Sequence, residues 1–196
     1  IAAVTEDTID ENTKAAEAKS RLEVLSDVDG VAVETYTDET ALGDTVAYCE
    51  GKDNGGNTVG YVFKSTAKGY GGDVTVMIGY DLSGTIVGFE VIAADDETPG
   101  LGQNSTKPEF WQQFKGMAGT VALQKNGGDV QAITAATITS TAVVTAINSA
   151  SDAFADLTGV AAQNQTQQEE TIRKAHEALM DKITQMNKIV NNAKQV

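Results

Sequence analysis

The middle of the chain groups apolar, β-branched and aromatic residues into short runs separated by polar and glycine-rich turns, which is the pattern of β-strands. Five segments carry this pattern: 31–37, 45–49, 58–65, 74–80 and 85–92. The last two flank residues 81–84 (Asp-Leu-Ser-Gly), a turn sequence, so we expect them to form a hairpin. The three long segments should be neighbours, and Val74, Val76 and Ile78 should face one side of the sheet.

Helical patterns lie before and after these strands. Ala, Lys and Glu dominate from about Glu6 to Val24, and a short helix is expected over 108–114, with Pro108 in its first turn. Trp111 and Phe114 are spaced to share one face of that helix. Because helices flank the strands rather than alternate with them, the sequence predicts an α+β fold with a mostly antiparallel sheet flanked by helices.

The C-terminal region has a different pattern. Residues 161–168 are polar and resemble a linker, and an amphipathic helix is expected over 171–196. Its apolar positions recur at three- and four-residue steps: Ile172, Ala175, Leu179, Ile183, Met186 and Val190. The helix either packs on its own domain or binds a partner helix. We therefore expect three parts: an N-terminal helix (1–28), a globular domain (29–158), and a linker with a C-terminal amphipathic helix (159–196).

Composition excludes several classes of function. The 196 residues carry a net charge of −14, which argues against binding to nucleic acid or to anionic lipid headgroups. One cysteine, Cys49, allows no internal disulfide, and with His176 as the one histidine no metal-ligand cluster is expected. No nucleophile–base set or phosphate-binding lysine loop is evident, so we expect no catalytic residues and assign any activity to a cofactor.

A hydroxyl-rich turn, Thr134-Ala-Ala-Thr137, runs directly into an apolar-periodic helix. The first N–H groups of a helix lack intrahelical partners, so this position suits an anion such as a phosphate. Ala135 and Ala136 would let a bulky ligand approach the backbone closely. We expect Thr139 to be the N-cap, and Thr134 to bond the phosphate or the turn. The alternative is a threonine-rich cap without a ligand.

A second turn, Thr98-Pro-Gly-Leu-Gly102, follows the last predicted strand. Its proline and Gly100 occupy the central positions of a type II turn. Leu101 could then lie against a flat ring, with Gly102 keeping the approach open. The acidic residues before the turn, including Glu97, are solvated in the simplest interpretation. We expect the turns at 98–102 and 134–137 to meet in one groove.

Together, the two stretches resemble the FMN-binding domain shared by the G subunit of the Rnf ferredoxin:NAD oxidoreductase and the C subunit of the sodium-pumping NADH:quinone reductase. Residues 97–102 match the family pattern E-T-P-G-L-G. The second pattern, D-x-x-[ST]-G-A-T-x-[ST]-S, is matched at Asp129, Thr134, Ala136, Thr137, Thr139 and Ser140. Ala135 stands where the family usually has glycine, a residue that tolerates positive φ. The resemblance covers about residues 60–150.

The resemblance implies a function. FMN would be joined through its phosphate to the Thr137 hydroxyl by a flavin transferase, and the protein would be an electron-transfer subunit with the other subunits of a membrane redox complex as partners. The expected cofactor-binding residues are Thr137 (covalent FMN), Thr134, Ala135, Ala136, Thr139, Glu97, Thr98, Gly100, Leu101 and Gly102.

The chain begins at Ile1 without an initiator methionine, so we expect that an upstream segment is missing. The resemblance implies that this segment is a single N-terminal transmembrane helix, with this domain on the extracytoplasmic side of the cell membrane. We favour the G subunit over the C subunit. The contrasting hypothesis is a non-redox extracytoplasmic interaction protein.

Overall fold

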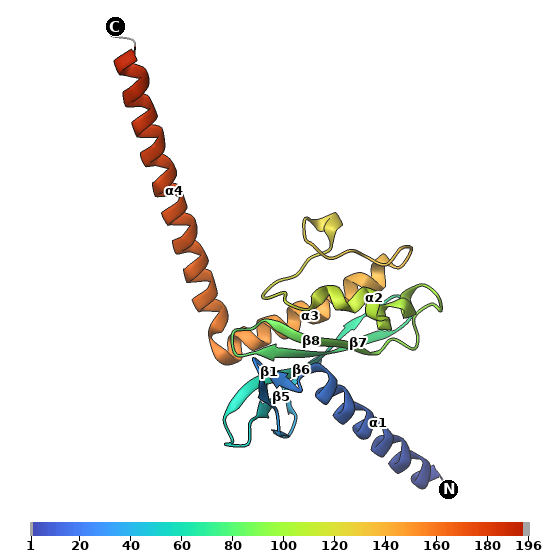
Figure 1. The fold of residues 1–196 in the computed structure, drawn as a ribbon. Helices are drawn as coiled ribbons and strands as arrows, with labels where there is room; N and C mark the ends of the chain where they lie inside the picture. Colours follow the sequence, from blue (N-terminus) through green and yellow to red (C-terminus); the bar gives the residue numbers. More distant parts are fainter. Residues whose placement is uncertain (1, 194–196) are drawn as a thin grey trace. The chain divides into compact units, whose positions relative to one another are not determined.

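The fold was obtained as a computed structural model, which describes the backbone of residues 2–193 and the side chains of residues 13–160 and 173–189 (Figure 1). The chain divides into two compact units, residues 1–157 and 158–196, and each is described by itself. The first unit contains a mostly antiparallel sheet flanked by helices, so the predicted α+β class is confirmed. The boundaries of the expected domains remain a prediction.

The main sheet is built around four long strands in chain order. They are β5 (Val46–Lys52), β6 (Thr58–Lys68), β7 (Asp73–Asp81) and β8 (Ile86–Ala93). Each pairs antiparallel with the next, in agreement with the predicted antiparallel sheet. Short strands β3 (Thr35–Tyr36) and β4 (Thr40–Ala41) pair with the free edge of β5, and β1 (Asp27–Val28) with β2 (Val31–Ala32) forms a separate two-stranded ribbon. The predicted turn between β7 and β8 is held by Asp81, whose carboxylate accepts hydrogen bonds from Ser83 and Thr85 N–H.

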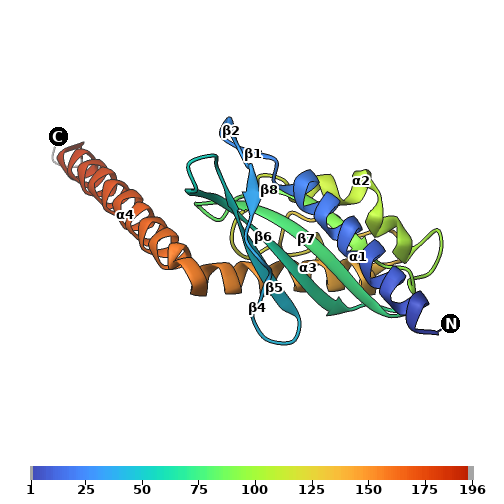
Figure 2. The same cartoon turned by 90° about the horizontal axis from the view of Figure 1, so that it is seen from below.

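Strand β7 is buried on both faces in its central part. Val74, Val76 and Ile78 are fully buried on one face, as predicted. Met77 points to the other face and packs with Val24, at the end of α1 (Ala2–Val24). The views in Figures 1 and 2 show α1 and α3 (Thr137–Thr158) on opposite sides of the strands. Helices therefore cover both faces of the sheet, which explains why Met77 is as apolar and as buried as Val76 and Ile78 on either side of it.

Helix α1 ends directly against the sheet because two paired glycines leave room for its backbone. Gly79 and Gly88 are directly opposite in the β7–β8 register, and a Cβ atom at either would meet the carbonyl of Val24. The hydroxyl of Tyr36 also donates to the carbonyl of Leu25, just past the helix. The N-terminal helix is thus positioned by close backbone packing.

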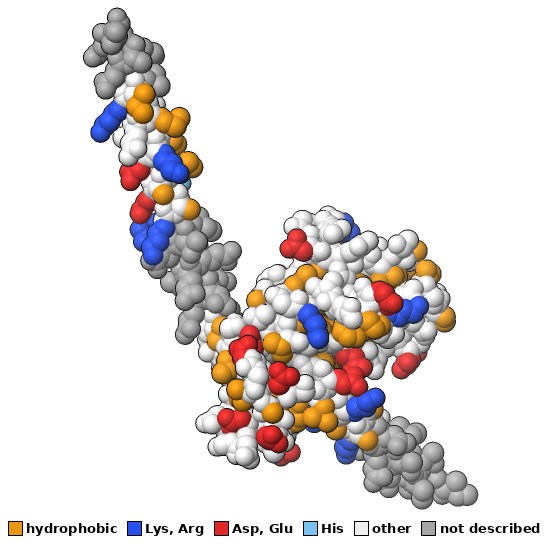
Figure 3. Space-filling view, in the orientation of Figure 1, with side chains coloured by type: hydrophobic (Ala, Val, Ile, Leu, Met, Phe, Trp, Pro, Cys, Tyr) orange, Lys and Arg blue, Asp and Glu red, His pale blue; other side chains and the backbone are white. Residues whose placement is uncertain are grey.

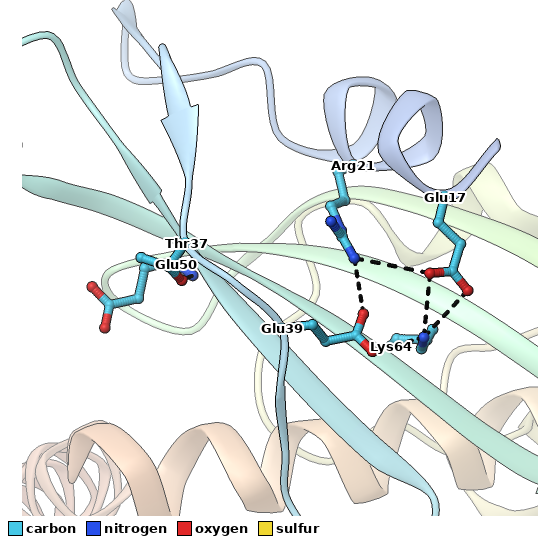
Figure 4. Close-up of polar contacts among 6 residues, drawn as sticks. All are labelled: Glu17, Arg21, Thr37, Glu39, Glu50 and Lys64. Carbon is cyan, nitrogen blue, oxygen red and sulfur yellow. Dashed lines mark hydrogen bonds and ion pairs between the residues drawn. The ribbon is translucent and has the colours of Figure 1, made fainter. Parts of the chain in front are cut away.

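An ion-pair network lies where α1 meets the sheet (Figure 4). It consists of Glu17, Arg21, Glu39 and Lys64. Arg21 contacts Glu39 at 3.0 Å, and Lys64 contacts Glu39 at 2.8 Å and Glu17 at 3.2 Å. All four side chains are partly exposed, with 21–30% of their surface accessible. The network joins α1, the loop before β4, and β6.

The segment after β8 folds as short helical turns: η1 (Gly102–Thr106), α2 (Pro108–Trp111) and η2 (Gln112–Phe114). The predicted helix near Pro108 is present, but its buried face is different from the predicted one. Phe110 rather than Trp111 shares the buried face with Phe114, and their rings pack edge to face at 5.5 Å. Phe110 and Phe114 are four residues apart, and this spacing places two side chains on one face of an α-helix just as the three-residue spacing of Trp111 and Phe114 does, so the spacing alone did not decide which pair is buried.

The C-terminal unit is one long helix, α4 (Val160–Ala193). The predicted polar linker at 161–168 is therefore wrong, because its backbone is helical. Its residues are polar but include no glycine or proline, and Gly159, with φ of 72°, is the residue that separates α3 from α4. Among the described seam residues, Leu179, Ile183 and Met186 are exposed. Whether this helix binds a partner remains a prediction.

Candidate functional site

The first predicted turn has the expected geometry. Leu101 N–H donates to the carbonyl of Thr98 at 3.1 Å, which closes a four-residue turn. Gly100, its third residue, has φ of 73°, as a type II turn requires. The Asn104 side chain donates to the Gly100 carbonyl at 2.7 Å and holds the turn against η1.

The second predicted turn leads into α3, which begins at Thr137 rather than near Thr139. Thr139 lies inside the first turn of the helix, so the expectation that it is the N-cap is wrong. Ser140 bridges this end instead. Its hydroxyl accepts from Ile133 N–H and donates to the carbonyl of Ala136, both at 2.9 Å. Thr137 is exposed, and the N–H groups of Thr137, Ile138 and Thr139 precede the first intrahelical hydrogen bond, which Ser140 N–H donates to the carbonyl of Ala136 at 3.0 Å.

Ala135 adopts a left-handed backbone conformation, with φ of 61°. This is the position where the resembling family usually has glycine. An alanine there costs about 1–2 kcal/mol because its Cβ crowds the following carbonyl. The chain therefore keeps the backbone conformation of a glycine while carrying a methyl group in the turn.

Glu97 is the largest departure from the sequence prediction. It is 2% exposed rather than solvated, and its carboxylate lies between three chain segments. Gly71 N–H donates to Oε1 at 2.9 Å, Gly72 N–H donates to the same atom at 3.4 Å, and the Thr139 hydroxyl donates to Oε2. One buried carboxylate thus ties the β6–β7 turn, the loop after β8 and the start of α3 together.

Hydrogen bonding keeps this carboxylate ionised. Burial by itself raises the pKa of Glu97, but the hydrogen bonds from Thr139 and from the backbone of Gly71, Gly72 and Tyr70 outweigh it, so the pKa lies below its ordinary value. The sequence supplies small residues where the carboxylate needs room. A Cβ at Gly102 would come within 2.6 Å of Glu97 Oε2 and 2.7 Å of Thr139 Oγ1. Gly102 therefore makes space for the buried acid as well as for a ligand.

The two turns line one groove of about 530 Å³, as the sequence predicts. Its lining residues are Tyr70, Glu97, Thr98, Leu101, Gly102, Ala135, Ala136, Thr137, Ile138 and Thr139. Thr134 and Gly100, two of the expected site residues, are not among them. Tyr70 and Ile138 line the groove without having been predicted from the sequence. The glycine-rich turn at 69–72 was a signal for Tyr70, but nothing in the sequence linked that turn to this groove.

The groove fits an elongated ligand with an anionic end and an apolar end. The start of α3 offers free N–H groups to an anion, and Leu101, Ile138 and Tyr70 supply apolar surface. Its volume lies in the usual range of about 300–1,000 Å³ for small-molecule sites. The one charged lining residue, Glu97, is already bonded to donors from its own chain. FMN has this combination of a phosphate and a flat ring.

Residues 69–152 match the family model of the FMN-binding domain. The chain carries an FMN-binding domain. FMN is thus its cofactor, and the matched range begins at the β6–β7 turn and ends near the end of α3, so it includes every lining residue of the groove. Acidic side chains are scattered over the visible face of this domain, in keeping with the net charge of the chain (Figure 3).

Similar proteins extend the comparison. Over 110 residues the chain is 46% identical to the G subunit of the ion-translocating oxidoreductase complex of Methanosarcina acetivorans, covering 55% of this chain and 57% of that protein. Over 109 residues it is 38% identical to the G subunit of the proton-translocating ferredoxin:NAD(+) oxidoreductase complex of Clostridium ljungdahlii, covering 54% of this chain and 58% of that protein. The chain thus spans little more than half the length of these relatives.

A solved structure is also similar. It is the C subunit of the Na(+)-translocating NADH-quinone reductase from Parabacteroides distasonis, with 27% identity and a TM-score of 0.44 over 56% of this chain and 61% of that chain. Among the residues that the structure describes here, no helix combines the length and apolar character needed to cross a membrane.

The FMN-binding domain departs from the second family pattern at two positions, Ala135 and Gln131. In that pattern the aspartate stands three residues before the Ser/Thr, and counting back from Thr134 gives Gln131. Asp129 lies two residues too early, so the match at Asp129 is wrong. The side chain of Gln113 holds the backbone of Gln131. Gln131 N–H donates to Gln113 Oε1 at 2.8 Å, and Gln113 Nε2 donates to the Gln131 carbonyl at 3.2 Å.

Proposed function

We propose that this chain is an electron-transfer flavoprotein subunit of a membrane ion-translocating oxidoreductase, similar to the G subunit of the Rnf complex, and that it carries FMN covalently on Thr137. The observation that carries the proposal is the meeting of the two turns in one groove at the start of α3. An exposed threonine, Thr137, lies at the end of this groove that suits an anion. The resemblance to G subunits over the domain supports the choice of complex.

The covalent step is a phosphoryl transfer. The Thr137 hydroxyl would attack the FMN phosphorus of FAD, a new oxygen–phosphorus bond would form, and AMP would leave as the hydroxyl proton is lost. A flavin transferase would supply the catalysis, because the one carboxylate that lines the groove, Glu97, is already engaged by donors of its own chain. The product is a phosphodiester anion. The helix N-terminus would stabilise it.

The neighbouring threonines are poorer acceptors. Thr139 is 1% exposed and its hydroxyl already donates to Glu97, so a transferase could not reach it without breaking the buried carboxylate site. Thr134 is exposed but does not line the groove. A flavin on Thr134 would have its phosphate away from the free N–H groups of α3. Both arguments favour Thr137.

Bound FMN would accept and donate electrons, and the protein would hold and shield it. An electron carrier of this kind needs no catalytic set of its own, because it passes electrons between neighbouring subunits. We further propose that those subunits are its partners, that a membrane helix precedes Ile1 in the whole protein, and that this domain lies on the extracytoplasmic side.

The test is loading of the protein with FAD, magnesium and a flavin transferase, followed by mass mapping of peptides. Wild type should gain one FMN, Thr137→Ala should gain none, and the matched controls Thr134→Ala and Thr137→Ser should still be loaded. An adduct on Thr134 or Thr139, or normal loading of Thr137→Ala, would show that the assignment is wrong. A wild-type protein that stays colourless would favour the non-redox interaction protein instead.

The two departures from the family pattern make the same experiment sharper. Ala135→Gly relieves the left-handed alanine, and Gln131→Asp restores the aspartate of the pattern. We expect the double variant to load FMN faster than wild type under limiting transferase. Slower loading would mean that this chain is matched to a transferase with different requirements.

A further inference from the structure

Tyr70 is an exposed aromatic residue in a turn whose backbone is held on both sides. It lies between β6 and β7, and Gly69 N–H donates to the Gly72 carbonyl at 2.7 Å to close the turn. The N–H groups of Gly71 and Gly72 are bonded to buried Glu97, so the backbone on the C-terminal side of Tyr70 is fixed. The tyrosine side chain is nevertheless 70% exposed.

The glycines around Tyr70 make this position specific. A Cβ at Gly69 would clash with the Glu97 carboxylate, and a Cβ at Gly71 would clash with the backbone carbonyl of Asp96. Only the residue between them can carry a side chain without disturbing the contact with the loop after β8. The turn therefore presents one aromatic ring beside the groove and no other bulk.

Two further exposed apolar side chains stand on the same groove. Leu101 is 38% exposed and Ile138 is 55% exposed, and both line it together with Tyr70. They come from three segments: the β6–β7 turn, the loop after β8, and the first turn of α3. Single exposed apolar residues are ordinary on protein surfaces, but three around one groove mark a binding site for an apolar group.

Leu101 and Ile138 stand in different positions relative to Thr137, at the end of the groove that suits an anion. Ile138 follows Thr137 directly, so it stands next to the proposed phosphate ester. Leu101 and Tyr70 come from the two segments that Glu97 joins to each other. A ring connected to Thr137 by a flexible chain would reach these two side chains.

We propose that Tyr70 contacts the isoalloxazine ring of the flavin, and that Leu101 and Ile138 complete the apolar frame of that ring. This inference rests on the proposed function, because it takes the flavin to be attached at Thr137. A phenol ring stacked on or edge-on to the flavin would add aromatic contact to its burial. It would also quench flavin fluorescence, since a phenol gives an electron to the excited flavin and takes it back as the pair returns to the ground state.

The test compares FMN-loaded wild type with Tyr70→Phe and Tyr70→Leu, each checked for equal loading by intact mass. Phenylalanine keeps the ring but is a far weaker electron donor, and leucine removes the ring altogether. We expect the flavin fluorescence lifetime to rise several-fold in both variants. Iodide should quench the flavin more strongly in Tyr70→Leu than in Tyr70→Phe or wild type, because only leucine uncovers the flavin.

The matched control is Tyr61→Phe. Tyr61 lies on β6, packs edge-on against Phe154 at 5.6 Å between ring centroids, and does not line the groove. Its variant should leave the lifetime unchanged. Equal lifetimes in wild type and both Tyr70 variants would overturn the inference while leaving FMN attachment intact. Failure of wild type to take up FMN would instead remove the proposed function, and this inference with it.

Discussion

Two charged clusters hold distant segments of this fold together, and they do so under different physical conditions. The ion-pair network of Glu17, Arg21, Glu39 and Lys64 is partly exposed, with opposite charges facing one another in water-accessible positions. Glu97 is buried, faces no cation in its hydrogen-bonded contacts, and is bonded by two glycine N–H groups and a threonine hydroxyl.

The two clusters can be compared directly because each joins residues that are about equally far apart in the sequence. Lys64 and Glu17 are separated by 47 residues, and Thr139 and Glu97 by 42. Exposed ion pairs contribute about 0–1 kcal/mol each because water and salt screen them. Buried donors and acceptors are costly to leave unpaired, so the Glu97 site should matter far more to stability and to the shape of the groove.

The largest expected effect is therefore at Glu97. Glu97→Ala leaves the N–H groups of Gly71 and Gly72 and the Thr139 hydroxyl without their acceptor, and should lower the free energy of unfolding by about 2–4 kcal/mol. Glu97→Gln keeps the shape and one acceptor oxygen, so its loss should be smaller. Urea unfolding measures both, with Glu39→Ala as the control from the exposed network. An effect of Glu39→Ala as large as that of Glu97→Ala would overturn the comparison.

The pH dependence of stability should show the next largest effect, because it measures how much the charge of Glu97 contributes. The folded-state pKa of Glu97 lies below its ordinary value, so its ionised form contributes stability that is fully present above the unfolded pKa of about 4.3. That contribution is lost as the pH falls through the lower folded-state value. The stability difference between wild type and Glu97→Gln should therefore be constant from about pH 7 to pH 6 and shrink below about pH 4. A difference that does not change with pH would mean that the charge of Glu97 contributes nothing.

The smallest effect is expected in the exposed network. A double-mutant cycle on Lys64→Met and Glu39→Gln should give a coupling free energy of about 0.5–1 kcal/mol, because the pair is only partly shielded from solvent. Raising the salt concentration to about 1 M should reduce it further. The same cycle on the surface pair Lys68 and Asp73, which lie 3.0 Å apart and are far more exposed, should give less. A coupling free energy that does not fall as salt is added would contradict the comparison, because it would mean that this network is shielded from solvent as the Glu97 site is.

The strands and turns around these clusters show where reasoning from sequence succeeds. The apolar runs predicted β6, β7 and β8, and the turn sequence at 81–84 predicted the hairpin of β7 and β8, because strand propensity and turn formation are local properties of the chain. The type II turn at Thr98 was equally readable, since Pro and Gly at its centre act on their own backbone angles. The composition of residues 134–137 likewise indicated a helix start with room for an anion.

The four long strands, the two groove-lining turns and Thr137 at the end of one of these turns therefore follow from local sequence. The segment predicted as one strand over 31–37 is an exception, because it forms β2 and β3 in two different sheets. The burial of Glu97, the hydrogen bond from Thr139 to this carboxylate and the position of Tyr70 beside the groove arise instead from the packing of the folded domain. Each of these depends on segments that are 26 to 42 residues apart in the chain. Whether a carboxylate is solvated or buried is set by the donors that packing brings to it, and those donors leave no mark on the residues beside it in sequence.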